Sequence, residues 1–101
     1  MRSSMDETHR FVVDGLSELK GEPYPGSNKD ADRRTYMRKL EFISPAEEKF
    51  FSCIYSLISE EASHKLVAPR ESMLVMHTTI YNYLLLLLKR LNDLANVQLR
   101  N

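Results

Sequence analysis

The sequence has a single cysteine, Cys53, and no tryptophan in 101 residues. One thiol cannot form an internal disulfide framework, which excludes a small secreted protein held together by disulfide bonds. We expect Cys53 to pack as a small apolar residue within a helix. The chain also lacks an excess of either charge, because 14 Lys and Arg residues balance 14 Asp and Glu residues. A domain that binds nucleic acid through a strongly basic surface would not show this balance.

Glycine and histidine are also sparse. Gly15, Gly21 and Gly26 stand singly, so there is no glycine-rich loop of the kind that binds nucleotide phosphates. Gly21 is instead placed to end a helix, because glycine adopts the left-handed cap conformation without strain. The three histidines fall in separate segments and have no zinc-site spacing. We therefore predict no cofactor and no bound metal ion, and we expect His9 on the surface of the first helix.

A long uninterrupted apolar run is absent too. The most apolar stretch, residues 73–88, is broken by polar side chains such as His77 and Asn82. A helix that spans a bilayer needs about 20 apolar residues. The first residues are polar and charged and do not resemble an apolar leader. We expect no membrane association and an intracellular location, cytoplasmic or nuclear.

What the sequence does contain is helical periodicity. Apolar residues recur at spacings of three and four along most of the chain, which predicts an all-α fold. We predict one domain, residues 1–101, built as a helical bundle of three to four helices with a long C-terminal helix. The helices are expected at about residues 4–20, 30–41, 45–62 and 70–99.

Three of these helices have recognisable start signals. Ser4 with Glu7, and the tetrapeptide Ser44-Pro45-Ala46-Glu47, match the capping box. In that motif a hydroxyl and a carboxylate bind backbone N–H groups that have no partner within the helix. Asp30 or Asp32 is expected to cap the second helix in a similar way.

The predicted C-terminal helix, 70–99, is long for a chain of this size. At about 1.5 Å per residue it measures about 45 Å, whereas a compact domain of this length is about 30 Å across. Two series at heptad spacing run along it, at positions 73, 80, 87, 94 and 77, 84, 91, 98. Five consecutive leucines, 84–88, point in all directions around the axis and need cover on every side.

This surplus of apolar surface predicts an intermolecular interface. The residues predicted to form it are Ile80, Leu84, Leu87, Leu88, Leu91 and Leu94. The alternative is that the other helices wrap the C-terminal helix completely. We predict a non-catalytic interaction or assembly subunit whose partner is a second copy, giving a homodimer, or another protein.

A basic cluster gives an alternative function. Arg33, Arg34, Arg38 and Lys39 lie close together on the second predicted helix, and such a face can hold phosphates. This pattern predicts a small helical regulator that contacts nucleic acid. The competing interpretation is a solvated, ion-paired face, because Asp30 and Arg34 are four residues apart on the same helix.

Arg70 and His77 give a second alternative. Six residues separate them, which places them two turns apart on one face of the predicted helix. This spacing resembles the long form of the motif in HEPN-type ribonucleases, which are all-helical. The resemblance implies that His77 acts as general acid or base and that Arg70 stabilises phosphate charge. Otherwise His77 is a partly buried, hydrogen-bonded residue in the apolar seam.

Overall fold

The computed structural model describes residues 2–64 and 70–100, with the side chains of residues 4–56 and 74–99. Over these residues the protein has four helices and no strands: α1 (Arg2–Lys20), α2 (Asp30–Lys39), α3 (Pro45–His64) and α4 (Arg70–Arg100). The predicted all-α bundle with a long C-terminal helix is confirmed. Each boundary lies within two residues of its predicted position. Residues 65–69 of the predicted connection lie outside the described residues.

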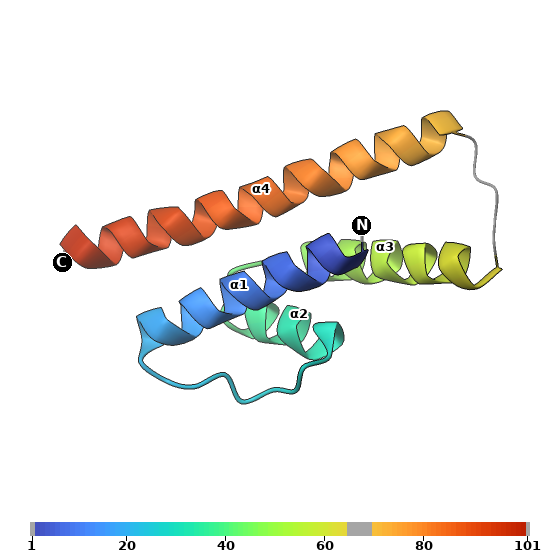
Figure 1. Cartoon of the computed structure of the whole chain (residues 1–101). Coiled ribbons are helices and arrows are strands. Elements are labelled where there is room, and N and C mark those ends of the chain that lie inside the picture. The colour runs from blue at the N-terminus through green and yellow to red at the C-terminus, as the bar shows by residue number, and fades with distance from the viewer. Residues whose placement is uncertain (1, 65–69, 101) are drawn as a thin grey trace.

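Helices α1 and α4 run side by side in the same direction, α2 lies on the other side of α1, and α3 extends from beside the start of α1 opposite the first half of α4 (Figure 1). The amide of Gln98 near the end of α4 donates a hydrogen bond to the carbonyl oxygen of Leu19 near the end of α1, at 2.9 Å. The 31 residues of α4 correspond to about 46 Å, and the longest dimension of the molecule is 50 Å. The 19 residues of α1 correspond to about 28 Å, so α4 extends well beyond its neighbour.

The apolar core lies between these helices. It consists of Met5, Val12, Val13, Leu16, Met37, Phe42, Ile43, Phe51, Ile80, Leu84, Leu87 and Leu91. Among the described residues, α1 is the only helix whose backbone closely approaches that of α4. Helix α3 reaches α4 through long side chains instead: the Tyr83 ring stacks on Phe50 at 4.6 Å between centroids and meets the edge of Phe51 at 5.5 Å.

Gly15 permits the close approach of α1 to α4. A Cβ atom at this position would lie 2.8 Å from Cδ2 of the buried Leu91. Glycine in a helix interior costs about 1 kcal/mol relative to alanine, so the sequence alone indicates only a weakness in α1. The structure shows that the missing side chain makes room for a neighbouring helix.

The ends of α1 and α2 share one arrangement. Gly21 ends α1 with φ 71°, as predicted, and its N–H donates to the carbonyl of Glu18. At the end of α2 the equivalent position is Glu41, with φ 60°. The Glu41 N–H donates to Arg38 O and the Phe42 N–H donates to Met37 O, both at 2.9 Å. These bonds form a Schellman motif with a carboxylate residue where glycine is usual.

The predicted start signals have mixed outcomes. The Ser44–Glu47 capping box is confirmed: the Ser44 N–H donates to Glu47 Oε1 at 2.9 Å and the Glu47 N–H donates to Ser44 Oγ at 3.1 Å. The prediction for Ser4 is wrong, because α1 begins at Arg2 and Ser4 lies inside the helix. The prediction for Asp30 and Asp32 is also wrong. Lys29 occupies the cap position without a side-chain bond, since Asp30 turns inward and Asp32 binds Ser27.

Replacing Gly15 by valine tests the approach of α1 to α4. The added methyl groups overlap Leu91, and we expect the free energy of unfolding to fall by about 1–3 kcal/mol. Urea denaturation followed by circular dichroism measures this change. Gly15→Ala is the graded control, because its gain in helix propensity of about 1 kcal/mol opposes the smaller overlap. A Gly15→Val protein as stable as the wild type would contradict the packing described.

Replacing Glu41 by glycine tests the left-handed cap of α2. An L-residue in this conformation costs about 1–2 kcal/mol, part of which glycine recovers. We expect Glu41→Gly to raise the free energy of unfolding by about 1 kcal/mol, measured by urea denaturation. Glu41→Asn should fall between the two, because asparagine tolerates this conformation better than glutamate. A destabilised Glu41→Gly protein would mean that the carboxylate itself supports the fold.

Candidate functional site

The predicted interface residues fall into two groups. Ile80, Leu84, Leu87 and Leu91 are buried within the chain's own core, and Leu91 lies against Gly15 of α1. Leu88 is half-buried against that core, and Leu94 is 45% exposed. The strongest heptad pattern of α4 is therefore occupied within the single chain, and most of the residues predicted as an interface are not available to a partner.

Apolar side chains nevertheless remain exposed along α4. They are Leu74, Val75, Tyr81, Leu85, Leu86, Leu94, Val97 and Leu99, with exposed fractions from 39% to 85%. Phe11 on α1 is also exposed, at 63%. Large exposed apolar residues that are scattered singly are ordinary on a protein surface, whereas contiguous ones mark interaction sites. The exposed set on one helix makes α4 the candidate interaction surface.

The five-leucine run is divided between inside and outside. Leu84 and Leu87 are buried, Leu88 is half-buried, and Leu85 and Leu86 are exposed at 48% and 39%. Complete wrapping of α4 by the other helices does not occur in this structure. Two of the five leucines are left to solvent, and they point to different sides of the helix because successive residues are about 100° apart.

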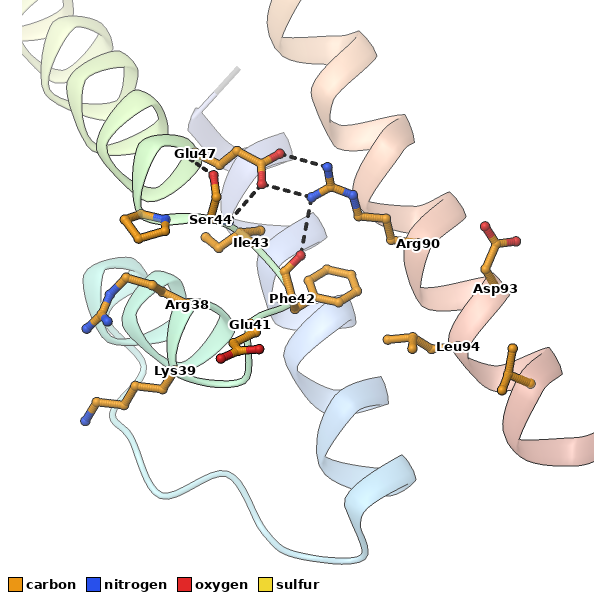
Figure 2. A pocket seen from close by; sticks show the side chains of 12 residues that line it. Arg38, Lys39, Glu41, Phe42, Ile43, Ser44, Glu47, Arg90, Asp93 and Leu94 are labelled. Carbon is orange, nitrogen blue, oxygen red and sulfur yellow. Dashed lines mark hydrogen bonds and ion pairs between the residues drawn. The ribbon is translucent and has the colours of Figure 1, made fainter. Parts of the chain in front are cut away.

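A second candidate site is a groove between α4 and the corner that joins α2 to α3. We call it the corner groove; it has a volume of about 1000 Å³, and its lining includes Glu41, Phe42, Pro45, Leu94 and Val97. Figure 2 shows Phe42 pointing from the corner toward α4 and Leu94 pointing from α4 toward the corner. Its walls are thus partly apolar and its rim is charged.

Arg90 closes one end of the corner groove. Its guanidinium lies 3.0 Å from Glu47 Oε2 and donates to Glu47 Oε1 at 3.1 Å, and it also donates to the carbonyl oxygen of Phe42 at 3.3 Å. Figure 2 shows these bonds linking α4 to the start of α3. Because Arg90 already has three acceptors, it is not an open binding site for an anion. The sequence does not indicate this pair, since nothing local relates positions 43 residues apart.

Glu47 has a lowered pKa. Burial acts to raise it, but the hydrogen bonds from Arg90, from the Ser44 backbone and from the Ser44 hydroxyl, with the charge of Arg90, outweigh burial. Glu47 therefore stays ionised to lower pH than an ordinary glutamate. One carboxylate thus serves both the helix cap and the link to α4.

The predicted basic cluster does not form one surface. Arg33 and Arg34 are buried, with exposed fractions of 4% and 7%. Arg38 pairs with Glu48 at 2.9 Å, and Lys39 extends away from α4 in Figure 2. Only part of the cluster faces solvent, so the structure does not provide the shared phosphate-binding face on which the nucleic-acid alternative depends.

Arg34 belongs to a buried ion-pair network. Its Nη1 lies 3.0 Å from Asp30 Oδ2, and Asp30 Oδ1 lies 2.8 Å from His9 Nδ1. The predicted Asp30–Arg34 pair is confirmed, but it is buried and not solvated. His9 is fully buried, contrary to the surface position predicted for it. His9 lies four residues after Met5 and three before Val12, so it belongs to the apolar stripe of α1. This spacing indicates burial.

This network orients α1 against α2 and α3. The His9 ring meets the edge of the Phe51 ring at 5.2 Å, and the Arg34 guanidinium lies over the ring of Tyr55 at 4.9 Å. Removing one partner of such a pair leaves an uncompensated buried charge, which costs about 3–5 kcal/mol. Because the His9 and Asp30 side chains are almost fully buried, no substrate reaches this His–Asp pair.

The residues of the ribonuclease resemblance are only partly described. His77 is exposed and lines a depression of about 340 Å³ with residues that include Ser4 and Tyr81. The alternative of a partly buried His77 is therefore wrong. Arg70 begins α4, but its side chain lies outside the described ones, so the pairing of Arg70 with His77 stays a prediction.

The remaining candidates do not form a site. Cys53 is exposed, so the prediction that it packs as an apolar residue is wrong. Within the described residues, no three His, Cys, Asp or Glu side chains gather in a way that would hold a metal ion. Over the same residues, none of the helices combines the length and apolar character needed to cross a bilayer.

Acid titration tests the role of Glu47. A carboxylate with a lowered folded pKa contributes stability that is complete above the unfolded value, about 4.3. That contribution is lost as the pH falls through the folded pKa. We expect the stability difference between wild type and Glu47→Gln to be largest near neutral pH and to shrink on acidification. Urea denaturation at several pH values measures it. Glu18→Gln, on the exposed surface of α1, is the control and should give a difference that changes little.

Comparison with known proteins gives no further guide to this site. The chain matches no family model, no curated protein and no solved structure.

Proposed function

We propose that this protein is a small non-catalytic interaction or assembly subunit that self-associates or binds another protein through the exposed side of α4. The observation that carries the proposal is the set of exposed apolar side chains on that helix, from Leu74 to Leu99. Burying an apolar side chain of this size contributes about 1.5–3 kcal/mol. Association is the simplest way to gain that free energy.

The nature of the polar groups supports a non-catalytic role. The His9–Asp30 pair is the kind of pair that acts in catalysis, but it is buried and serves packing. Arg90, one of the cations that line the corner groove, is held by Glu47 and by the Phe42 carbonyl. We also place the association in a reducing compartment, cytoplasmic or nuclear, because the single thiol of Cys53 is free.

The interface in this proposal differs from the one predicted from the sequence. Of the predicted residues it retains Leu94 and the half-buried Leu88, and it replaces the four core residues with exposed neighbours such as Tyr81 and Leu85. The helix is the same, but the side of the helix is different. The helix was recognised from its excess of leucine, whereas its free side depends on where α1 packs.

Paired substitutions on α4 test the proposal. Leu85→Glu combined with Val97→Glu places charges on exposed apolar positions, and Asn82→Glu combined with Asn96→Glu adds the same charge at exposed polar positions. We expect the wild type to exceed the monomer mass of 11.8 kDa in light scattering, or to retain a stoichiometric protein partner. The apolar pair should abolish that association with helicity unchanged, and the polar pair should preserve it.

A wild-type chain that is monomeric over the full concentration range, and that retains the same proteins as both variants, would overturn the proposed function. High salt distinguishes the type of contact, because apolar association persists there whereas association through surface charges weakens.

A further inference from the structure

A second heptad pattern runs along α4, one residue after the buried one. Its members are Leu74, Thr78, Tyr81, Leu85, Leu88, Asn92, Ala95 and Leu99, and we call them the outer seam. Their spacings alternate between four and three, which keeps them in one stripe along the helix. That stripe is rotated by about 100° from the core residues of α4.

The outer seam is accessible and uncharged. Leu74, Tyr81, Leu85 and Leu99 are exposed at 48% or more. Thr78 and Asn92 are also exposed, and Leu88 and Ala95 are half-buried. The other exposed side of α4 also carries apolar residues, Val75, Leu86 and Val97, but the charged pair Lys89 and Asp93 lies among them. A stripe without charge is the side of α4 best suited to an apolar partner.

Phe11 extends this surface onto α1. Ser4 of α1 lines a depression together with Tyr81 of α4. Phe11 lies seven residues after Ser4, and Leu88 lies seven residues after Tyr81, which is two turns along each helix. Because α1 and α4 run in the same direction (Figure 1), Phe11 and Leu88 occupy corresponding places. The exposed Phe11 ring therefore lies beside the middle of the outer seam.

We propose that a second copy of this chain covers the outer seam with its own outer seam, with the two α4 helices antiparallel. This inference rests on the proposed function and specifies its partner. The seam is complementary to itself under a two-fold rotation. When Leu85 faces Leu88 of the second copy, Tyr81 faces its Asn92, Thr78 faces its Ala95 and Leu74 faces its Leu99. Leucines meet at the centre and at both ends, and between them Tyr81 meets Asn92 and Thr78 meets Ala95.

The position of α1 favours the antiparallel arrangement. Helix α1 packs against Leu84 and Leu91, which adjoin the outer seam on one side. Antiparallel pairing places α1 of both copies on the same side of the α4 pair, so the two Phe11 rings approach the two-fold axis. Parallel pairing places the two α1 helices on opposite sides, where each Phe11 faces Lys89 of the other copy. The antiparallel pair therefore buries more apolar surface.

The same arrangement accounts for four of the five consecutive leucines. Leu84 and Leu87 fill the core of the chain, and Leu85 and Leu88 fill the centre of the outer seam. Two seams that differ by one residue require apolar residues at adjacent positions.

The rim of the proposed dimer is acidic. Glu7 and Asp14 lie one turn before and after Phe11 on α1, so the dimer brings like charges together. Added salt screens this repulsion and should strengthen the dimer.

Single substitutions within the leucine run test the seam. In sedimentation equilibrium we expect the wild type to give twice the mass of 11.8 kDa. Leu85→Glu should give a folded monomer, because each copy then buries a charge at the centre of the seam. Leu86→Glu is the matched control: it makes the same change at the next residue, which is 39% exposed but off the seam, and should leave the dimer intact.

Spin labels test the orientation without altering the seam. Cys53→Ser removes the native thiol, and a label on Asn96→Cys borders the seam without replacing any of its members. The antiparallel register separates the two labels by 19 residues along the axis, or about 28 Å. Parallel pairing brings them within about 15 Å. A long distance in pulsed dipolar spectroscopy supports the proposal, and a short one overturns it.

The outcomes distinguish this inference from the proposed function. Two results overturn the outer seam while leaving α4 as an interaction surface. In the first, Leu86→Glu dissociates the dimer and Leu85→Glu does not. In the second, added salt weakens the dimer. If the wild type is monomeric but binds another protein through α4, only the inference that the partner is a second copy is overturned. A monomer that binds nothing overturns both.

Discussion

The close packing of α1 against α4 determines most of what this structure can do. Gly15 lets α4 approach α1, and Leu91 fills the space that a side chain at Gly15 would occupy. Because α1 is the only described helix whose backbone lies this near α4, it decides which stripe of α4 enters the core. The remaining stripes are then exposed, and they include apolar residues as large as Leu85 and Tyr81.

Two polar links hold the smaller helices in place around this pair. The Ser44–Glu47 capping box begins α3, and the same Glu47 carboxylate binds Arg90 of α4. The buried Asp30 carboxylate binds both His9 of α1 and Arg34 of α2. Each link uses one carboxylate for two partners, which places opposite charges together. A core of this size has little room for more.

Local signals predicted the fold well, and long-range contacts could not be predicted. Apolar periodicity gave four helices, and the Ser44–Glu47 box and Gly21 gave ends that the structure confirms. The free side of α4 was not predictable, because it depends on where α1 packs. Arg33 and Arg34 illustrate the same limit: as a cluster of cations they resemble a phosphate-binding face, yet both are buried and Arg34 pairs with Asp30.

The pairing of α1 with α4 also has a consequence for folding during synthesis. The hydrogen bond from Gln98 to Leu19 joins residues 79 positions apart. The ribosome must therefore complete almost the whole of this sequence before α4 can dock on α1, and closing so long a loop carries an entropic cost. Until then Val12, Val13 and Leu16 lack part of their final cover. A nascent chain that still lacks α4 should be a preferred client of chaperones that bind exposed apolar segments.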